Sequence, residues 1–290
     1  MKLKQALRLK KILRLPRWLL VFVLLGGGFV YWQEVQQREY HAYAGLPQVQ
    51  DWKDWQNWHR VLRNEGFMMG YSDWRLNPLW VIYRLDNRPT SSIGPRPTRF
   101  DADWRTLPFW QVTHDNYTRS GYDRGHLAPN YAIAQIHGRE AQLKTFLMTN
   151  ISPQTPELNR QVWQRIEQSA MDHFVQIKGE LWVITGPVFG DRKNRLSSDP
   201  RVHIPEAFYK IFVAPPRDGR PLKVLAFLVP QQVNGREPLD QFLVSVREVE
   251  QQTGLNFLHR LPQELQDELE TVIQPEPWQL GVVNRRMGRF

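Results

Sequence analysis

Short apolar runs recur along the middle of the chain and predict β-strands. Apolar residues in continuous or alternating order over a few positions indicate strands that are buried on one or both faces. Helical segments lie between and after these runs without regular alternation, so we predict an α+β fold with a mostly antiparallel central sheet flanked by helices. The expected strands occupy residues 79–83, 146–149, 181–185, 208–213 and 224–229.

Helix boundaries are marked at three places. Thr155 and Pro156 suit the N-cap and the first position of a helix, because a threonine side chain can accept from a free backbone N–H and proline has no N–H to leave unpaired. Residues 245–248 read Ser-Val-Arg-Glu, a capping box, and Gly254 is suited to end the helix that follows. A last helix is expected over residues 261–273.

An apolar segment near the N-terminus predicts a membrane anchor. Residues 18–33 hold no charge, and they follow seven basic residues and no acidic residue. A helix of this length spans about 24 Å, a little short of the ~30 Å hydrocarbon core, and Arg17 at its edge can extend to the lipid headgroups. Because the basic residues lie on one side only, residues 1–17 are expected to form a cytoplasmic tail. We therefore expect a single-pass protein of the inner (cytoplasmic) membrane whose folded part faces the periplasm or the exterior.

Two alternatives to this location remain open. Residues 42–44 read Ala-Tyr-Ala and resemble the cleavage site of a signal peptide, although they lie roughly ten residues beyond the apolar segment. That gap favours an uncleaved anchor. An organellar inner membrane is also compatible with the segment.

Residues 34–60 are expected to connect the anchor to a folded domain at residues 61–290. Trp52, Trp55 and Trp58 recur at every third position, which is consistent with one face of a helix. This face would dock onto the folded domain or lie on the membrane surface.

The charge of the chain is concentrated at its N-terminus. The formal net charge is +9, from 38 basic and 29 acidic residues; without the seven basic residues of the N-terminal segment, 31 basic residues face the same 29 acidic ones. Binding of a polyanion therefore has to be argued from particular residues. The absence of cysteine excludes disulfides, thiolate nucleophiles and Cys-ligated metals, and the sequence holds no HExxH, P-loop or GxSxG motif.

One short segment collects three chemically active side chains. It closes a stretch, residues 86–123, that is rich in Pro, Asn, Asp and Arg and is expected to form long ordered loops, which are common places for binding residues. Asp123, Arg124 and His126 place an acid, a guanidinium and an imidazole around Gly125, which allows close approach of another chain segment. A neutral imidazole can accept a proton at neutral pH. A single histidine is more often structural, so this segment alone does not define a site.

A second segment adds ligands suited to a hard cation. If a helix begins at Thr155, then Asn159, Trp163 and Glu167 are spaced four residues apart and lie along one helix face. An amide oxygen and a carboxylate on one face suit an ion that keeps several of its waters, as Mg²⁺ does. The alternative is an ordinary half-exposed helix with Trp163 buried.

The two segments together resemble the DNA/RNA non-specific endonucleases, the ββα-metal nucleases that carry a DRGH motif. The likeness extends over about residues 70–272, and several motifs in one order make it specific. It implies the ββα-metal nuclease fold. Further matching segments are Thr98-Arg99-Phe100, Thr185-Gly186-Pro187, the stretch His203-Ile204-Pro205-Glu206-Ala207-Phe208-Tyr209-Lys210 and residues 246–255.

The resemblance implies a role for each matched side chain. His126 corresponds to the general base. Asn159 corresponds to the one direct protein ligand of Mg²⁺, and Glu167 to a carboxylate that holds the ion through water, with Mn²⁺ as an alternative ion. Arg99 and Arg124 correspond to the arginines that bind the phosphate and stabilise its charge.

Two more matched positions are implied as supporting residues, and one position departs from the pattern. Asn150 and Asp123 correspond to polar residues that support the site. Family members can carry an additional arginine four residues after the glutamate, where this chain has Met171. This departure puts one phosphate contact in doubt, but not the core chemistry.

The implied function is metal-dependent hydrolysis of DNA and RNA without sequence preference, leaving 5′-phosphate ends. A bound cation can neutralise the leaving oxygen, and forked arginine hydrogen bonds can stabilise the phosphate, whose contacts carry no sequence information. Three rivals are an anchored nucleic-acid-binding module without catalysis, a phosphodiesterase of the same fold that acts on small substrates, and a structural protein of the cell envelope. The oligomeric state is left open, and a homodimer is compatible with the sequence.

Overall fold

The computed structural model describes residues 17–88, 94–190 and 194–286, so the expected cytoplasmic tail lies outside the described residues except for Arg17. The chain forms two compact units, Met1–Tyr40 and His41–Phe290. Helix α2 (Arg17–His41) is longer than the predicted apolar segment. Its part Trp18–His41 is long and apolar enough to cross a membrane, by length and composition, and the most apolar window of this part has a mean hydropathy of 1.5 with none of it buried. The membrane anchor itself stays a prediction.

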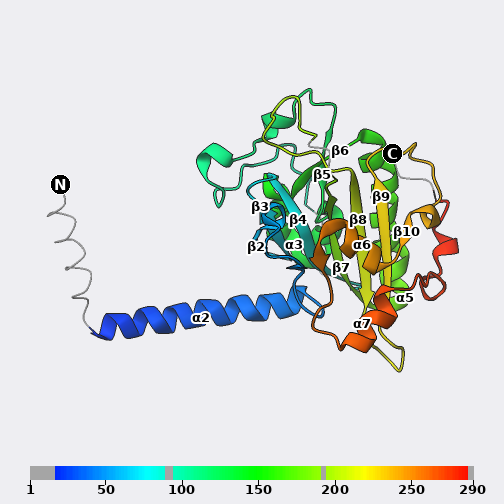
Figure 1. The fold of residues 1–290 in the computed structure, drawn as a ribbon, viewed down its shortest axis with the longest axis horizontal. Helices are drawn as coiled ribbons and strands as arrows, with labels where there is room; N and C mark the ends of the chain where they lie inside the picture. Colours follow the sequence, from blue (N-terminus) through cyan, green and yellow to red (C-terminus); the bar gives the residue numbers. More distant parts are fainter. Residues whose placement is uncertain (1–16, 89–93, 191–193, 287–290) are drawn as a thin grey trace. The chain divides into compact units, whose positions relative to one another are not determined.

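A seven-stranded antiparallel sheet forms the centre of the second unit (Figure 1). The strands lie in the order β10-β9-β8-β7-β4-β3-β2, and every neighbouring pair is antiparallel. This confirms the predicted α+β fold with a mostly antiparallel sheet. The strands are β2 (Arg60–Asn64), β3 (Phe67–Ser72), β4 (Asn77–Asp86), β7 (Glu180–Val188), β8 (Ala207–Ala214), β9 (Lys223–Pro230) and β10 (Leu243–Val244).

Helices pack on both faces of this sheet because its central strands are apolar on both sides. Successive side chains of a strand point to opposite faces, and β4 therefore buries Tyr83 in one apolar cluster and Ile82 in another. The face with Tyr83, here called the cleft face, is covered by helix α4 (Gln164–Ser169). The opposite face, here called the α6–α7 face, is covered by α6 (Val246–Thr253) and α7 (Gln263–Glu270).

Four of the five predicted strands are confirmed, in β4, β7, β8 and β9. The strand predicted at residues 146–149 is wrong, because Phe146 N donates to Leu143 O (3.1 Å) in a turn and the chain then forms the short 3-10 helix η4 (Met148–Asn150). Phe146 and Met148 are buried, so the apolar run there reflects packing of the side chains. The structure adds β2, β3 and β10 to the sheet, which the sequence pattern did not predict.

The predicted helix caps at Thr155 and Ser245 are confirmed. Pro156 begins a helical run, and Thr155 Oγ1 accepts from the backbone N of Leu158 at 3.4 Å. At the start of α6, Ser245 Oγ accepts from the backbone N of Glu248 at 3.1 Å. The run from Pro156 consists of η5 (Leu158–Trp163), α4, η6 (Ala170–Phe174) and α5 (Val175–Lys178), of which η5 and η6 are π-helical.

The last helix, α7, is shorter than the predicted range 261–273. Pro262 has an extended backbone with ψ 143° and acts as the N-cap, so the helix begins only at Gln263. The Thr271 C-cap ends it, before two short 3-10 turns. The remaining helical segments are α3 (Asn130–Lys144), η1 (Trp55–Asn57), η2 (Pro108–Trp110), η3 (His114–Tyr117), η7 (Leu239–Phe242), η8 (Glu276–Trp278) and η9 (Leu280–Val282).

Most of the expected connector, residues 41–60, belongs to the compact unit that begins at His41. There β1 (Gln48–Val49) pairs antiparallel with β11 (Leu255–Asn256). The helix face predicted from three tryptophans is wrong, because only Trp55 lies in a helix, the three-residue η1. All three indoles are exposed to solvent, Trp52 by 73%, Trp55 by 48% and Trp58 by 58%.

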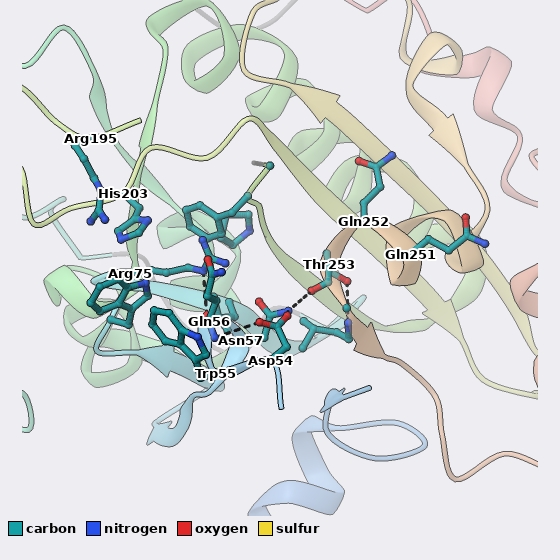
Figure 2. A pocket seen from close by; sticks show the side chains of 17 residues that line it. Asp54, Trp55, Gln56, Asn57, Arg75, Arg195, His203, Gln251, Gln252 and Thr253 are labelled. Atoms are coloured by element: carbon teal, nitrogen blue, oxygen red, sulfur yellow. Dashed lines mark hydrogen bonds between the residues drawn. The ribbon is translucent and has the colours of Figure 1, made fainter. Parts of the chain in front are cut away.

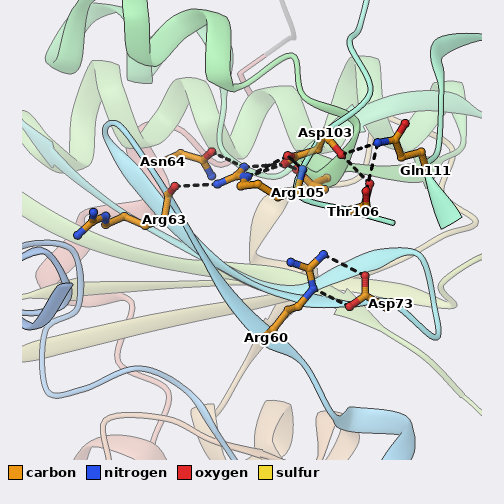
Figure 3. Close-up of polar contacts among 9 residues, drawn as sticks. Arg60, Arg63, Asn64, Asp73, Asp103, Arg105, Thr106 and Gln111 are labelled. Carbon is orange, nitrogen blue, oxygen red and sulfur yellow. Dashed lines mark hydrogen bonds and ion pairs between the residues drawn. The ribbon is translucent and has the colours of Figure 1, made fainter. Parts of the chain in front are cut away.

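A buried ion pair fixes the long loop between β4 and β5 to the sheet (Figure 3). Asp103 has no exposed side-chain surface and accepts from Arg105 Nη2 at 2.6 Å and from Thr149 Oγ1 at 2.7 Å. Arg105 also donates to Arg63 O and to Asn64 Oδ1 of β2, both at 2.8 Å. The prediction of ordered loops is therefore confirmed for this part of the chain.

Candidate active site

A small hairpin followed by a helix carries the residues that the sequence singled out. Strands β5 (Asp123–His126) and β6 (Ile151–Gln154) pair antiparallel, with Asp123 opposite Gln154 and His126 opposite Ile151. The helical run from Pro156 follows directly. A Cβ at Gly125 would collide with the buried side chain of Gln154, so a larger residue here would force that side chain to move.

A cleft of about 660 Å³ lies between this hairpin and the helix. Five of the predicted site residues line it together, and they come from β5 and from the helical run. These residues are Asp123, Arg124, His126, Asn159 and Glu167. Arg99 and Asn150 do not line it.

His126 is held between two aromatic rings and is kept neutral. Its ring centroid lies 5.2 Å from that of Phe100 and 4.9 Å from that of Phe146. Its Nε2 is buried and has no hydrogen-bond partner among the described residues. Burial and the nearby charge of Arg96 lower the pKa of His126 to about 3. The ring therefore carries a free lone pair at neutral pH, as a general base requires.

Asp123 orients the side chain of Asn159. Asp123 Oδ2 accepts from Asn159 Nδ2 at 2.9 Å, and the same carboxylate accepts two hydrogen bonds from Arg160, both at 2.7 Å. Burial raises the pKa of Asp123, but these hydrogen bonds hold it below its usual value. Because the amide nitrogen of Asn159 faces Asp123, its carbonyl oxygen Oδ1 is the atom left to face a cation.

The helix keeps Asn159, Trp163 and Glu167 on one side. Over eight residues a regular α-helix advances about 80° beyond two full turns, so side chains at that spacing drift apart. The wider turn of η5, a π-helix, counters this drift, and such turns are frequent at functional sites. Trp163 is buried, and its Nε1 donates to His126 O at 3.3 Å, which ties the helix to the hairpin.

A buried lysine lies beneath Glu167. Lys210 of β8 has no exposed side-chain surface, and its Nζ lies 3.4 Å from Glu167 Oε1 and 3.3 Å from the hydroxyl of Tyr83. The same ammonium lies 4.4 Å from the centre of the Trp163 ring. Burial raises the pKa of Glu167 and Lys210 opposes that rise, while burial lowers the pKa of Lys210.

The arginines differ in how they relate to the cleft. Arg124 lines it, and its Nε and Nη2 donate to His114 O at 3.1 and 2.7 Å. Arg99 is exposed and pairs with Asp115 at 3.0 Å, so its predicted phosphate contact stays a prediction. Arg96 lines the cleft instead.

Asn150 acts on the backbone that follows His126. It is fully buried, its Oδ1 accepts from Ala128 N at 2.9 Å, and its Nδ2 donates to Ala128 O at 3.0 Å and to Thr145 O at 2.9 Å. These contacts fit the predicted supporting role, which stays a prediction. Met171, at the position that departs from the family pattern, lines the cleft.

Three residues of this site were not predicted from the sequence. Arg96 lay unnoticed among the many arginines of the loop, and Arg160 directly follows Asn159. Lys210 lies in a matching stretch but received no role. Its signal was a lysine between Tyr209 and Ile211 in a predicted buried strand, because a buried charge needs a partner.

Relatives of this chain are nucleases. A protein named nuclease from Nostoc sp. is 31% identical over 222 residues, which are 73% of this chain and 78% of that protein. Human mitochondrial endonuclease G is 28% identical over 207 residues, covering 67% of this chain and 68% of that protein. Nuclease EXOG of Xenopus laevis is 29% identical over 205 residues, 67% of this chain and 56% of that protein.

The fold and the family model agree with these relatives. A crystal structure of the EndoG/EndoGI complex matches the fold with a TM-score of 0.66 and 24% identity, and covers 79% of this chain and 92% of the matched chain. The predicted nuclease fold is thereby confirmed. The model of the DNA/RNA non-specific endonucleases matches residues 47–264, which confirms the resemblance drawn from the motifs. This chain therefore belongs to the DNA/RNA non-specific endonuclease family.

Proposed function

We propose that this protein is a metal-dependent endonuclease that hydrolyses DNA and RNA without sequence preference and leaves 5′-phosphate ends. The supporting observation is a single cleft lined by a neutral imidazole, an oriented amide, a carboxylate and a guanidinium, from His126, Asn159, Glu167 and Arg124. This is the set of groups that phosphodiester hydrolysis needs.

The donor atoms around the cleft fit a hard cation with few protein ligands. The described residues hold no cluster of three His, Cys, Asp or Glu side chains that could bind a metal, which disfavours a closed zinc-type site. Asn159 Oδ1 would hold Mg²⁺ or Mn²⁺ directly, and Glu167 would hold it through water. Such an ion supplies charge neutralisation at the leaving 3′-oxygen.

The side chains of the chain itself divide the remaining work. His126 takes a proton from the attacking water, since its ring is neutral at working pH. Arg124 donates forked hydrogen bonds to the phosphate, while Asp123 keeps the Asn159 amide turned the right way. Lys210 balances the charge of Glu167 from below. Contacts of this kind are made to the phosphate and do not distinguish one base from another, which supports cleavage without sequence preference.

We also propose that residues 18–33 anchor the protein in the inner (cytoplasmic) membrane, with residues 1–17 in the cytoplasm and the nuclease domain in the periplasm. The apolar length of α2 and the one-sided basic flank support this orientation. Protease treatment of spheroplasts tests it. The nuclease domain should be degraded from outside, and its protection until lysis would overturn the orientation.

The nuclease proposal is tested with the full chain in detergent. Wild type and His126→Ala are incubated with plasmid DNA and with RNA, in Mg²⁺ and in EDTA. Degradation of both polymers by the wild type only, and only with metal, is expected. A folded wild type that binds DNA without cutting it would indicate the binding module instead. Mapping of the ends by ligation, with and without phosphatase, checks the 5′-phosphate.

A further inference from the structure

A second cavity, of about 530 Å³, shares no lining residue with the cleft (Figure 2). It is formed by η1, by the loop before β4, by the end of β7 and by the C-terminal end of α6. His203, from the matching stretch that ends at Lys210, also lines it. The proposed nuclease reaction uses none of these residues.

Two arginines of this cavity have no carboxylate partner among the described residues. Arg75 is only 8% exposed, its Nε donates to Gln56 O at 3.1 Å, and its guanidinium lies 4.3 Å from the centre of the Phe189 ring. Arg195 donates to Arg201 O at 3.3 Å. Neither makes an ion pair with a described residue. Unpaired guanidiniums in a partly buried cavity favour an anionic ligand.

The electrostatics of the two arginines also favour an anionic ligand. Burial lowers the pKa of Arg75 to about 10; Asp54 opposes this shift and the charge of Arg195 adds to it. Burial also lowers the pKa of Arg195. Asp54 lines the cavity too, but its two oxygens already accept from Gln56 N (3.2 Å) and from Asn57 Nδ2 (2.8 Å). An anion between the two arginines would relieve their mutual repulsion.

The cavity also offers flat apolar surface. The rings of Trp55 and Trp74 lie 4.8 Å apart at 70°, and these residues are 48% and 50% exposed. Arg195 lies 5.9 Å from the centre of the Trp74 ring. Half-exposed indoles next to guanidiniums suit a ligand that combines an aromatic ring with a negative charge, because bases stack on such rings.

We propose that this cavity binds a nucleoside phosphate, with the phosphate between Arg75 and Arg195 and the base on Trp74 or Trp55. The volume is within the range of small-molecule sites, about 300–1,000 Å³. The nucleotide is either a free mononucleotide or one residue of a nucleic acid strand. Both offer the same phosphate and base to the cavity. This site lies outside the cleft and takes no part in the proposed cleavage step.

Calorimetry on the full chain in detergent tests this proposal. The His126→Ala protein in EDTA is titrated with AMP, adenosine, inorganic phosphate and a phosphorothioate decanucleotide. AMP should bind, and adenosine and phosphate should each bind at least about tenfold more weakly, because each lacks one half of the interaction. Equal binding of AMP and phosphate would overturn the base contact. Affinity of the decanucleotide above that of AMP identifies a strand as the source, and equal or lower affinity identifies a free nucleotide.

Matched variants locate the binding. Trp74→Ala and Arg195→Gln should each weaken AMP at least about tenfold. Trp110→Ala, a similarly exposed indole outside the cavity, and Asn159→Ala in the cleft should leave the affinity unchanged. Loss of AMP binding in Asn159→Ala but not in Trp74→Ala would overturn the proposal, as would no binding of AMP at all. A chain that cuts no nucleic acid but binds AMP through Trp74 would contradict the nuclease proposal and still support the nucleotide site.

Discussion

The two faces of the sheet hold carboxylates that differ in their charged neighbours. On the cleft face, Glu167 lies 3.4 Å from one buried cation, Lys210. On the α6–α7 face, Glu250 and Glu270, which are 1% and 0% exposed, share Arg247, whose guanidinium lies 2.9 Å from each carboxylate. One carboxylate opposite one cation can stay ionised, whereas two that share one cation cannot both ionise without strain. We infer that the cleft face holds charge for chemistry and that the other face uses its cluster for packing. Changes on the first face should therefore alter activity, and changes on the second should alter stability.

The largest effect is expected from His126 on the cleft face. His126→Ala should lower turnover about 10²–10⁴-fold, the usual size of a general-base contribution. The His126 side chain is only partly buried, so a denaturation curve should show that the variant is still folded. Initial rates on plasmid DNA in saturating Mg²⁺ measure the loss. Wild-type rates in the variant would show that another group takes the proton.

The next largest effect on activity is expected from Lys210. Lys210→Met keeps the side-chain length but removes the cation, so Glu167 loses its partner and its pKa should rise further. Outer residues that support metal ligands typically change activity or affinity about 10–100-fold, and a loss of that size is expected. The Glu167→Gln and Lys210→Met changes should not add in the double variant, because both remove the same charge pair. Additive losses would mean that the two residues act separately.

A smaller effect, on metal binding, is expected from Asn159 on the cleft face. Asn159→Ala removes the oriented carbonyl oxygen, and the Mg²⁺ concentration that gives half-maximal rate should rise about tenfold or more. Asp123→Asn should produce a smaller rise, since it only loosens the orientation of the amide. Titration of Mn²⁺ binding by electron paramagnetic resonance checks this without relying on activity. An unchanged titration in Asn159→Ala would remove this residue from the metal site.

Spacing along a helix predicted that Asn159 and Glu167 share a side, because both lie on one element, but the π-helical turn of η5 that keeps them together was not predicted. Lys210 could not be assigned in this way, since its partner is 43 positions away in sequence and meets it only when β8 packs under the helix. Arg96 was also not found from the linear pattern, whereas the phosphate contact of Arg99 stays a prediction. The chain turns within the loop, so Arg96 lines the cleft while Arg99 pairs with Asp115 outside it. Apolar patterning likewise found four strands of the sheet, but it missed β2, β3 and β10 and misread residues 146–149, because it reports burial rather than backbone shape.

The smallest effect is expected on the α6–α7 face, and it concerns pH and stability. Burial, with Glu250 and Asp267 adding and Arg247 opposing, raises the pKa of Glu270 from 4.5 to about 7. The folded state therefore holds this proton more tightly than the unfolded state. The stability that it contributes is fully present below about pH 4.5 and is lost as pH rises through about 7.

Glu270→Gln copies the protonated form at every pH and should remove this loss. Between pH 5 and pH 8 the free energy of unfolding of the wild type should fall by about 1–3 kcal/mol more than that of the variant, given ~1.4 kcal/mol per pKa unit. Urea denaturation of residues 41–290 at both pH values measures this. Glu268→Gln on the exposed side of the same helix is the control and should behave as the wild type. A variant that lost cutting activity instead of changing this pH dependence would contradict the division of labour between the two faces, because Glu270 lies on the opposite side of the sheet from the cleft.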